Sequence, residues 1–180
     1  MKTRKSVNKG ESVIRVGVIT VSDKASRGER VDESGAAIKD MAGSFGGEVT
    51  YYKIVPDEAK DISAAIKECA DYDKADLILT TGGTGFGPRD ITPEATRALI
   101  EREAPGISEF IRSEGAKSSK RAILSRAVSG IRGSSLIINL PGSPRAVRES
   151  LESISDILSH GIDILKKRAV ECAGGIHVSK

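Results

Sequence analysis

The sequence predicts an α/β domain in which a mostly parallel β-sheet is covered by helices. Its 180 residues fall within the size of one domain, because a single hydrophobic core keeps growing to roughly 250 residues. Apolar residues make up 38% of the chain, which is enough for a buried core and argues against disorder. Short β-branched runs alternate with amphipathic helical patterns, an order typical of parallel strands joined by right-handed crossovers.

The alternation begins with a buried strand. Residues 13–21 form a near-continuous apolar run, which predicts a strand buried on both faces. Residues 33–45 predict a helix that stops at the glycine pair 46–47. The alternating pattern of 48–55 predicts a second strand.

The middle of the chain predicts two more helices separated by a strand. One helix opens after 56–58, where apolar side chains recur at helical spacing up to Cys69. A third strand at 76–81 runs directly into a glycine-rich loop. The Thr-Pro-Glu triplet at 92–94 then marks a helix start, since Thr can cap, Pro suits the first position and Glu complements the dipole.

The last third predicts two strands between two helices. The Pro-Gly pair at 105–106 interrupts the preceding helical pattern, and a further helix is expected at about 107–114. Residues 121–128 and 134–140 predict two strands, with part of this region antiparallel. A long helix at about 144–167 places its apolar side chains on one face.

Composition disfavours several classes of function. Aromatic residues make up 3% of the chain and Trp is absent, which weakens any interpretation that needs stacking platforms for nucleic-acid bases. Two histidines are too few for a His-based metal cluster, and the two cysteines, Cys69 and Cys172, match no metal-ligand spacing. Cys69 falls on an apolar helical stripe and is expected in the core.

The ends of the chain predict tails around one domain. We expect a flexible basic tail at 1–12, the domain at 13–168 and a C-terminal tail at 169–180. No apolar run has the length of a signal peptide before the first strand or of a bilayer span. We therefore expect a cytoplasmic protein with no nucleic-acid or membrane partner.

Four loops follow the predicted strands and are rich in Gly, Ser, Thr or Asp. Ligands of open parallel sheets bind beyond the carboxyl ends of the strands, so these loops are expected to form one site. The loops are 22–28, 56–58, 82–90 and 141–144.

The glycine-rich loop is the most informative of the four. Four glycines within 82–87 let backbone N–H groups approach an anion, and Thr84 adds a hydroxyl donor beside the helix that follows. The loop matches neither a Walker A motif nor a GxGxxG fingerprint. A phosphate cradle is favoured over the alternative, a tight turn that only needs positive φ angles.

Two aspartates, Asp57 and Asp90, each lie just before a predicted helix. One interpretation is helix capping, worth about 1 kcal/mol each. The other is a carboxylate pair that holds Mg²⁺ against phosphate oxygens. Both stay open for Asp57, whereas Asp90 has Thr92 beside it as the better cap, which favours function. Ser143 and Ser22 have the same ambiguity between capping and ligand contact.

Long ordered motifs then resemble the molybdopterin adenylyltransferase family, which includes the G domain of gephyrin. The matching segments are VITVSDKASRG followed by DESG, then VPDE, GGTGFGPRDITPEAT and AILSRAVSGIRGSSLIINLPGSP. They cover about 14–165, nearly the entire predicted domain. The resemblance implies a three-layer α/β/α fold with helices on both faces of the sheet, and a trimer.

The resemblance also implies an activity. Family members use Mg²⁺ and ATP to place AMP on the phosphate of molybdopterin, releasing pyrophosphate, and a partner protein then inserts the metal. A non-catalytic molybdopterin carrier or scaffold is the alternative, but a carrier needs no Mg²⁺ site. The intact PRDITPE segment favours the active branch of the family.

Site residues carry over by position in the motifs. Asp57 and Asp90 match the two essential aspartates, expected to be catalytic and to hold Mg²⁺. The expected substrate-binding residues are Ser22, Asp23, Gly82, Gly83, Thr84, Gly85, Ser125, Pro141, Gly142 and Ser143. Gly115 departs from the family, whose members often have a serine there; Ser118 and Ser119 are candidate substitutes for a contact to the pterin.

Overall fold

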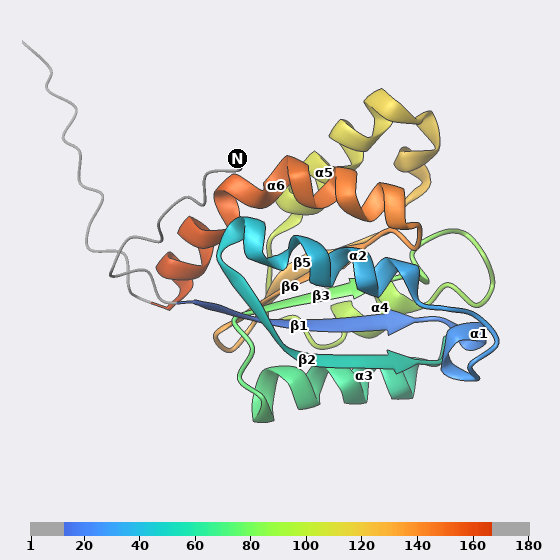
Figure 1. Cartoon of the computed structure of the whole chain (residues 1–180), viewed down its shortest axis with the longest axis horizontal. Coiled ribbons are helices and arrows are strands. Elements are labelled where there is room, and N and C mark those ends of the chain that lie inside the picture. Colours follow the sequence, from blue (N-terminus) through green and yellow to red (C-terminus); the bar gives the residue numbers. More distant parts are fainter. Residues whose placement is uncertain (1–12, 167–180) are drawn as a thin grey trace, which may run out of the picture.

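The computed structural model describes residues 13–166, and Figure 1 shows a central sheet with helices on both sides. The expected tails at 1–12 and 169–180, and Cys172, lie outside the described residues. The strands are β1 (Ile14–Val21), β2 (Gly47–Val55), β3 (Leu77–Thr81), β4 (Arg102–Glu103), β5 (Ser129–Arg132) and β6 (Ser135–Leu140). The helices are α1 (Asp23–Ser26), α2 (Glu33–Ala42), α3 (Ala59–Lys67), α4 (Thr92–Arg97), α5 (Pro105–Ser118) and α6 (Pro144–Leu165).

The sheet is parallel except at one edge. Its strand order is β2-β1-β3-β6-β5-β4, and the first four of these pair in parallel. Strands β5 and β4 add an antiparallel edge, as expected for part of this region. The carboxyl ends of four parallel strands therefore meet along one edge of the sheet.

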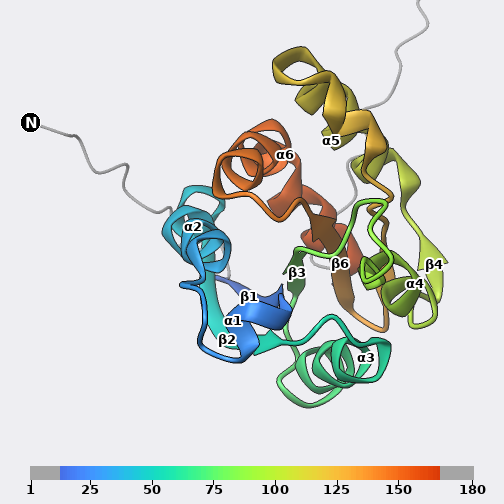
Figure 2. The ribbon, with the colours of Figure 1, turned by 90° about the vertical axis from the view of Figure 1, so that its right-hand side faces the viewer.

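Helices cover both faces of the sheet, so the predicted three-layer fold is confirmed. One core lies under α2, α5 and α6 and includes the apolar stripe of α6, from Val147 to Ile162. The other lies under α3 and α4 and includes Cys69, which is fully buried as expected. Figure 2 shows α2 and α6 on one side of the strands and α3 on the other. Within residues 13–166, no helix is long and apolar enough to cross a membrane.

Local signals set several helix ends. The Asp32 carboxylate accepts a hydrogen bond from Gly35 N–H at 2.8 Å and caps α2. A short 3₁₀ turn, Gly43–Phe45, then ends at Gly46 with φ of 77°, a conformation that favours glycine. The Ser143 hydroxyl caps α6 through Ala146 N–H.

The predicted strand at 121–128 is wrong. Lys120–Leu124 form a 3₁₀ helix, and strand β5 begins only at Ser129. The backbone N–H of Arg126 donates to Thr84 O at 2.9 Å, and that of Val128 donates to the Asn139 side chain at 3.2 Å. These two N–H groups bind a loop and a side chain and do not pair with a neighbouring strand. The segment therefore packs against the glycine-rich loop.

One boundary and two short elements differ from the sequence prediction. The separate helix expected at about 107–114 is α5, but it begins at Pro105, whose missing N–H is harmless in the first turn. The two-residue strand β4 and the one-turn helix α1 are too short to give a periodic pattern.

Gly17 in β1 gives a test of core packing. A Cβ at Gly17 would lie 2.0 Å from Cys69 Sγ, so Gly17→Ala should lower the free energy of unfolding by about 1–3 kcal/mol. Adding Cys69→Ala to this variant should recover part of the loss. Urea denaturation at equilibrium measures each value.

Gly161→Ala in α6 is the matched control. A Cβ there would contact nothing within 4 Å, so this substitution should stabilise the helix by about 0.5–1 kcal/mol. Equal effects at the two glycines would contradict the packing explanation.

Candidate active site

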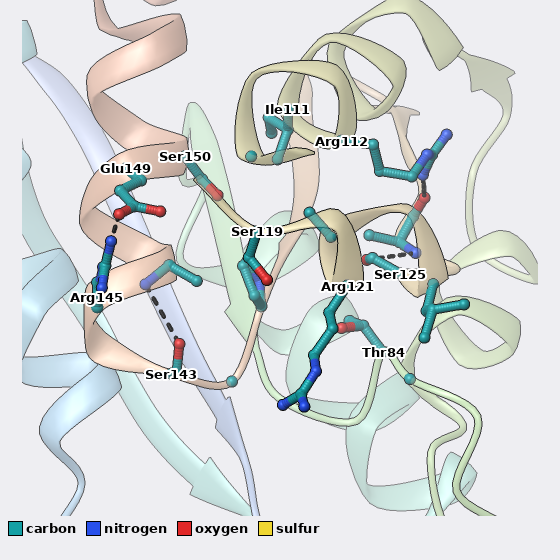
Figure 3. Close-up of a pocket in the computed structure, with 18 of the residues that line it drawn as sticks. Thr84, Ile111, Arg112, Ser119, Arg121, Ser125, Ser143, Arg145, Glu149 and Ser150 are labelled. Atoms are coloured by element: carbon teal, nitrogen blue, oxygen red, sulfur yellow. Dashed lines mark hydrogen bonds and ion pairs between the residues drawn. The ribbon is translucent and has the colours of Figure 1, made fainter. Parts of the chain in front are cut away.

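A cavity of about 550 Å³ lies beyond the carboxyl ends of β3 and β6. Figure 3 shows that side chains from α5, the 3₁₀ segment, the start of α6 and the glycine-rich loop face it. The structure brings eight of the predicted site residues to its lining. They are Gly83, Thr84, Gly85, Asp90, Ser125, Pro141, Gly142 and Ser143.

A second cavity of about 240 Å³ lies beside the end of β1. Its lining includes Ser22, Asp57 and Gly82, and it shares Gly142 with the larger cavity. A Cβ on Gly142 would lie 3.2 Å from Gly82 Cα. The two cavities are therefore adjacent and separated by closely packed backbone, where side chains are excluded.

The glycine-rich loop needs its glycines for two structural reasons. Gly82 and Gly83 have φ of 97° and 61°, which the turn requires. Gly85 and Gly87 have ordinary φ, but a Cβ on either would lie 2.9 Å from Asp90 Oδ2. These two glycines let the loop close around the Asp90 carboxylate, which accepts a hydrogen bond from Gly87 N–H at 2.8 Å.

Several loop amides remain available to an anion. Within residues 13–166, the N–H groups of Gly83, Thr84 and Gly85 donate to no protein acceptor. All three residues line the larger cavity. Backbone N–H groups without a protein acceptor beside a cavity are groups that can bind an anion.

Neither candidate aspartate caps the helix that follows it in the sequence. Helix α3 is preceded by Glu58 and α4 by Ile91, and neither helix has a side-chain cap. The prediction that Thr92 is a cap is also wrong. Its fully buried hydroxyl donates instead to Gly82 O at 2.9 Å and so fixes the start of the glycine-rich loop.

Asp57 lies among other carboxylates. Its carboxylate accepts from Asp23 N–H at 2.7 Å, and its own N–H donates to Asp23 Oδ1 at 3.0 Å. Burial raises the pKa of Asp57, and the negative charges of Asp23 and Asp90 raise it further. A cation bound beside Asp57 would favour its ionised form.

Asp23, which the sequence predicts to bind substrate, lines neither of these two cavities. Its carboxylate accepts from Arg89 Nη2 at 2.9 Å and from Arg89 Nε at 3.1 Å. Hydrogen bonding to Arg89 lowers the pKa of Asp23. Asp23 thus contacts neighbouring protein groups in this structure.

The sequence interpretation missed the arginines of the site. Arg126 donates to Gly85 O at 2.7 Å, and also to Asp90 O and the Glu94 carboxylate. Its place beside Ser125 in the Leu-Ser-Arg motif was the available signal. Arg126 is not part of the larger cavity's lining, but three other arginines are: Arg112, Arg121 and Arg145.

The position that departs from the family also faces the larger cavity. Gly115 lines it together with Ser118 and Ser119. A Cβ on Gly115 would lie 3.0 Å from the Cβ of Ala122, so glycine lets α5 approach the 3₁₀ segment closely. Both candidate substitute serines are thus placed on the cavity wall.

The two cavities differ in chemistry. The larger one combines serine hydroxyls, arginines and unused loop amides, which suits a polar anionic ligand. The smaller one lies next to Asp57. The glycine-rich loop and its carboxylate lie where ligands of the two cavities would meet.

Comparison with known proteins gives consistent matches. A 'Molybdopterin adenylyltransferase' of Helicobacter pylori is 43% identical over 155 residues, covering 84% of this chain and 88% of that protein. The 'Molybdenum cofactor synthesis protein cinnamon' of Drosophila melanogaster is 42% identical over 153 residues, which are 84% of this chain. The match spans only 26% of the Drosophila protein.

A solved structure and a family model agree with these relatives. The 'Molybdopterin biosynthesis enzyme MoaB' of Thermus thermophilus is 48% identical, with a TM-score of 0.82, over 86% of this chain and 98% of that one. The family described as 'Probable molybdopterin binding domain' matches residues 17–160. The chain therefore belongs to the family of molybdopterin-binding domains.

Proposed function

We propose that this chain transfers AMP from ATP to molybdopterin and releases pyrophosphate. The observation that carries the proposal is the meeting of two cavities at Gly142, with Asp57 lining one and Asp90 the other. Two substrates bound in these cavities would meet beside both carboxylates. Relatives named molybdopterin adenylyltransferase support the same assignment.

The larger cavity suits molybdopterin. Serine hydroxyls match the polar edge of a pterin, and arginines match its phosphate. We assign the smaller cavity, with Ser22 and Asp57, to the nucleotide. The glycine-rich loop between them would hold the phosphates that react.

The reaction needs alignment more than a protein nucleophile. An oxygen of the molybdopterin phosphate attacks the α-phosphorus of ATP and forms a new P–O bond. The bond from the α-phosphorus to the bridging oxygen breaks, and pyrophosphate leaves with that electron pair. The amides of Gly83, Thr84 and Gly85 would stabilise the developing charge and orient the groups for in-line attack.

The donor set fits Mg²⁺. Within residues 13–166, no group of three or more His, Cys, Asp or Glu side chains is placed to hold a metal. Asp57 and Asp90 instead provide two carboxylates next to a phosphate site, and Mg²⁺ is commonly held by one or two carboxylates plus substrate. The bound ion would neutralise phosphate charge.

Asp90→Asn tests the catalytic role. The amide oxygen can still accept from Gly87 N–H, so the loop and the melting temperature should change little. Adenylyl transfer should fall by about 10²–10³, as for loss of one electrostatic stabiliser. Molybdopterin binding should persist within a few-fold.

Asp61→Asn, on the exposed first turn of α3, is the control and should keep its turnover. Pyrophosphate release and thermal unfolding are measured on the same preparation. Near-normal turnover of Asp90→Asn would remove Asp90 from the active site. A wild-type chain that binds molybdopterin without releasing pyrophosphate would favour the carrier alternative.

Ser125→Ala tests the assignment of the larger cavity. The Ser125 hydroxyl accepts only a long hydrogen bond, 3.3 Å, from Ala127 N–H, so its loss should leave the fold intact. Molybdopterin should bind about fivefold more weakly, corresponding to about 1 kcal/mol for one hydrogen bond. The nucleotide should bind unchanged. Ser155→Ala, at a half-buried position of α6 that lines neither cavity, should alter neither affinity.

We also propose a cytoplasmic homotrimer that delivers its product to a metal-insertion partner. The family resemblance supports this assembly. Sedimentation equilibrium should therefore give about three chains per particle. A monomer at every concentration would contradict the proposal.

A further inference from the structure

Arg89 connects three of the loops at the carboxyl edge of the sheet. It lies near the end of the loop that follows β3, and its guanidinium pairs with Asp23 after β1 and with Glu58 after β2. The contact to Asp23 is bidentate, at 2.9 and 3.1 Å, and the contact to Glu58 is 2.7 Å. One planar side chain thus crosslinks loops that are far apart in sequence.

Asp23 extends this connection to Asp57. Asp23 Oδ1 accepts from Arg89 Nη2 and also from Asp57 N–H, while Asp57 Oδ2 accepts from Asp23 N–H. The Arg89 side chain is therefore linked to Asp57 through a single residue, Asp23. Along the backbone it is also the immediate neighbour of Asp90.

Charge repulsion opposes this arrangement. Asp23, Asp57, Glu58 and Asp90 gather four carboxylates around the ends of three strands. Among the described residues, Arg89 is the cation that makes ion pairs with members of this group. The guanidinium of Arg89 offsets the repulsion between these carboxylates. Its planar fork also fixes the orientation of the carboxylates that it binds, which the compact ammonium of a lysine does less well.

We propose that the Arg89–Asp23 pair, supported by Glu58, is a positioning device that sets how Asp57 and Asp90 face each other. The inference rests on the proposed function. Neither Arg89 nor Asp23 lines either cavity, so the pair acts through the two aspartates. Arg89 is 54% exposed, and its replacement leaves the core intact.

A double-mutant cycle tests this role. Asp23→Asn removes the charge but keeps an oxygen that can accept from Asp57 N–H, and Arg89→Gln removes the guanidinium. Each single variant should lower kcat by about tenfold, with KM for ATP and for molybdopterin changed by less than about twofold. The kcat of the double variant should resemble that of each single variant, because each substitution already removes the same interaction between Arg89 and Asp23.

Two further variants sharpen the cycle. Arg89→Lys keeps the charge without the fork and should recover only part of kcat. Arg148→Gln is the matched control, since Arg148 is 46% exposed and pairs with Asp40 away from the site; its kcat should equal that of the wild type. The proposal would be overturned if the kcat losses of the two single variants multiplied in the double variant. It would also be overturned if Arg89→Gln raised KM for ATP at unchanged kcat. The raised KM would instead indicate direct contact between Arg89 and phosphate.

Amide hydrogen exchange separates this inference from the proposed function. In the unliganded protein, the N–H groups of Asp23 and Asp57 should exchange several-fold faster in Arg89→Gln than in the wild type. In Arg148→Gln, their exchange rates should equal those of the wild type. If exchange is faster in Arg89→Gln but the wild type forms no adenylylated product, the proposed function is contradicted and the positioning role is supported. Product formation with neither exchange nor kcat altered in Arg89→Gln would refute the positioning role alone.

Discussion

The close packing of the glycine-rich loop around the Asp90 carboxylate is the constraint on which the site depends. Side chains at Gly85 and Gly87 would collide with this carboxylate, so glycine backbone packs against it. Arg126 holds the same loop from the other side through Gly85 O and Asp90 O. The result is a carboxylate and a row of amides presented together at one edge of a rigid sheet.

A buried polar network fixes the strand ends beneath this loop. The Asn139 amide donates to the hydroxyls of Thr80 and Thr96, both at 2.9 Å. The Thr81 hydroxyl donates to Pro141 O at 2.7 Å. Because buried polar groups are costly unless paired, such bonds favour a single arrangement of β3, β6 and α4. The loops that line both cavities therefore start from fixed positions.

Charge is distributed unevenly over the site. Carboxylates gather at the ends of β1, β2 and β3, whereas arginines line the larger cavity. Under the proposed function, the arginines of the larger cavity would bind one phosphate, and a cation would bring the other to the carboxylates. Like charges held close together make the ion pairs of Arg89 and Arg126 important for geometry, although exposed pairs add little to stability.

The sequence by itself determined the parallel sheet, the helices on both faces and the loops that carry Gly, Thr and Asp, because periodicity, caps and glycine stops are local signals. The tertiary structure alone decided which loop residues line the two cavities. Asp23 binds Arg89 and lines neither of them, and Arg126 within 121–128 binds the glycine-rich loop instead of a strand. Such outcomes depend on partners distant in the sequence, such as Thr84 for Arg126, and no local pattern encodes those partners.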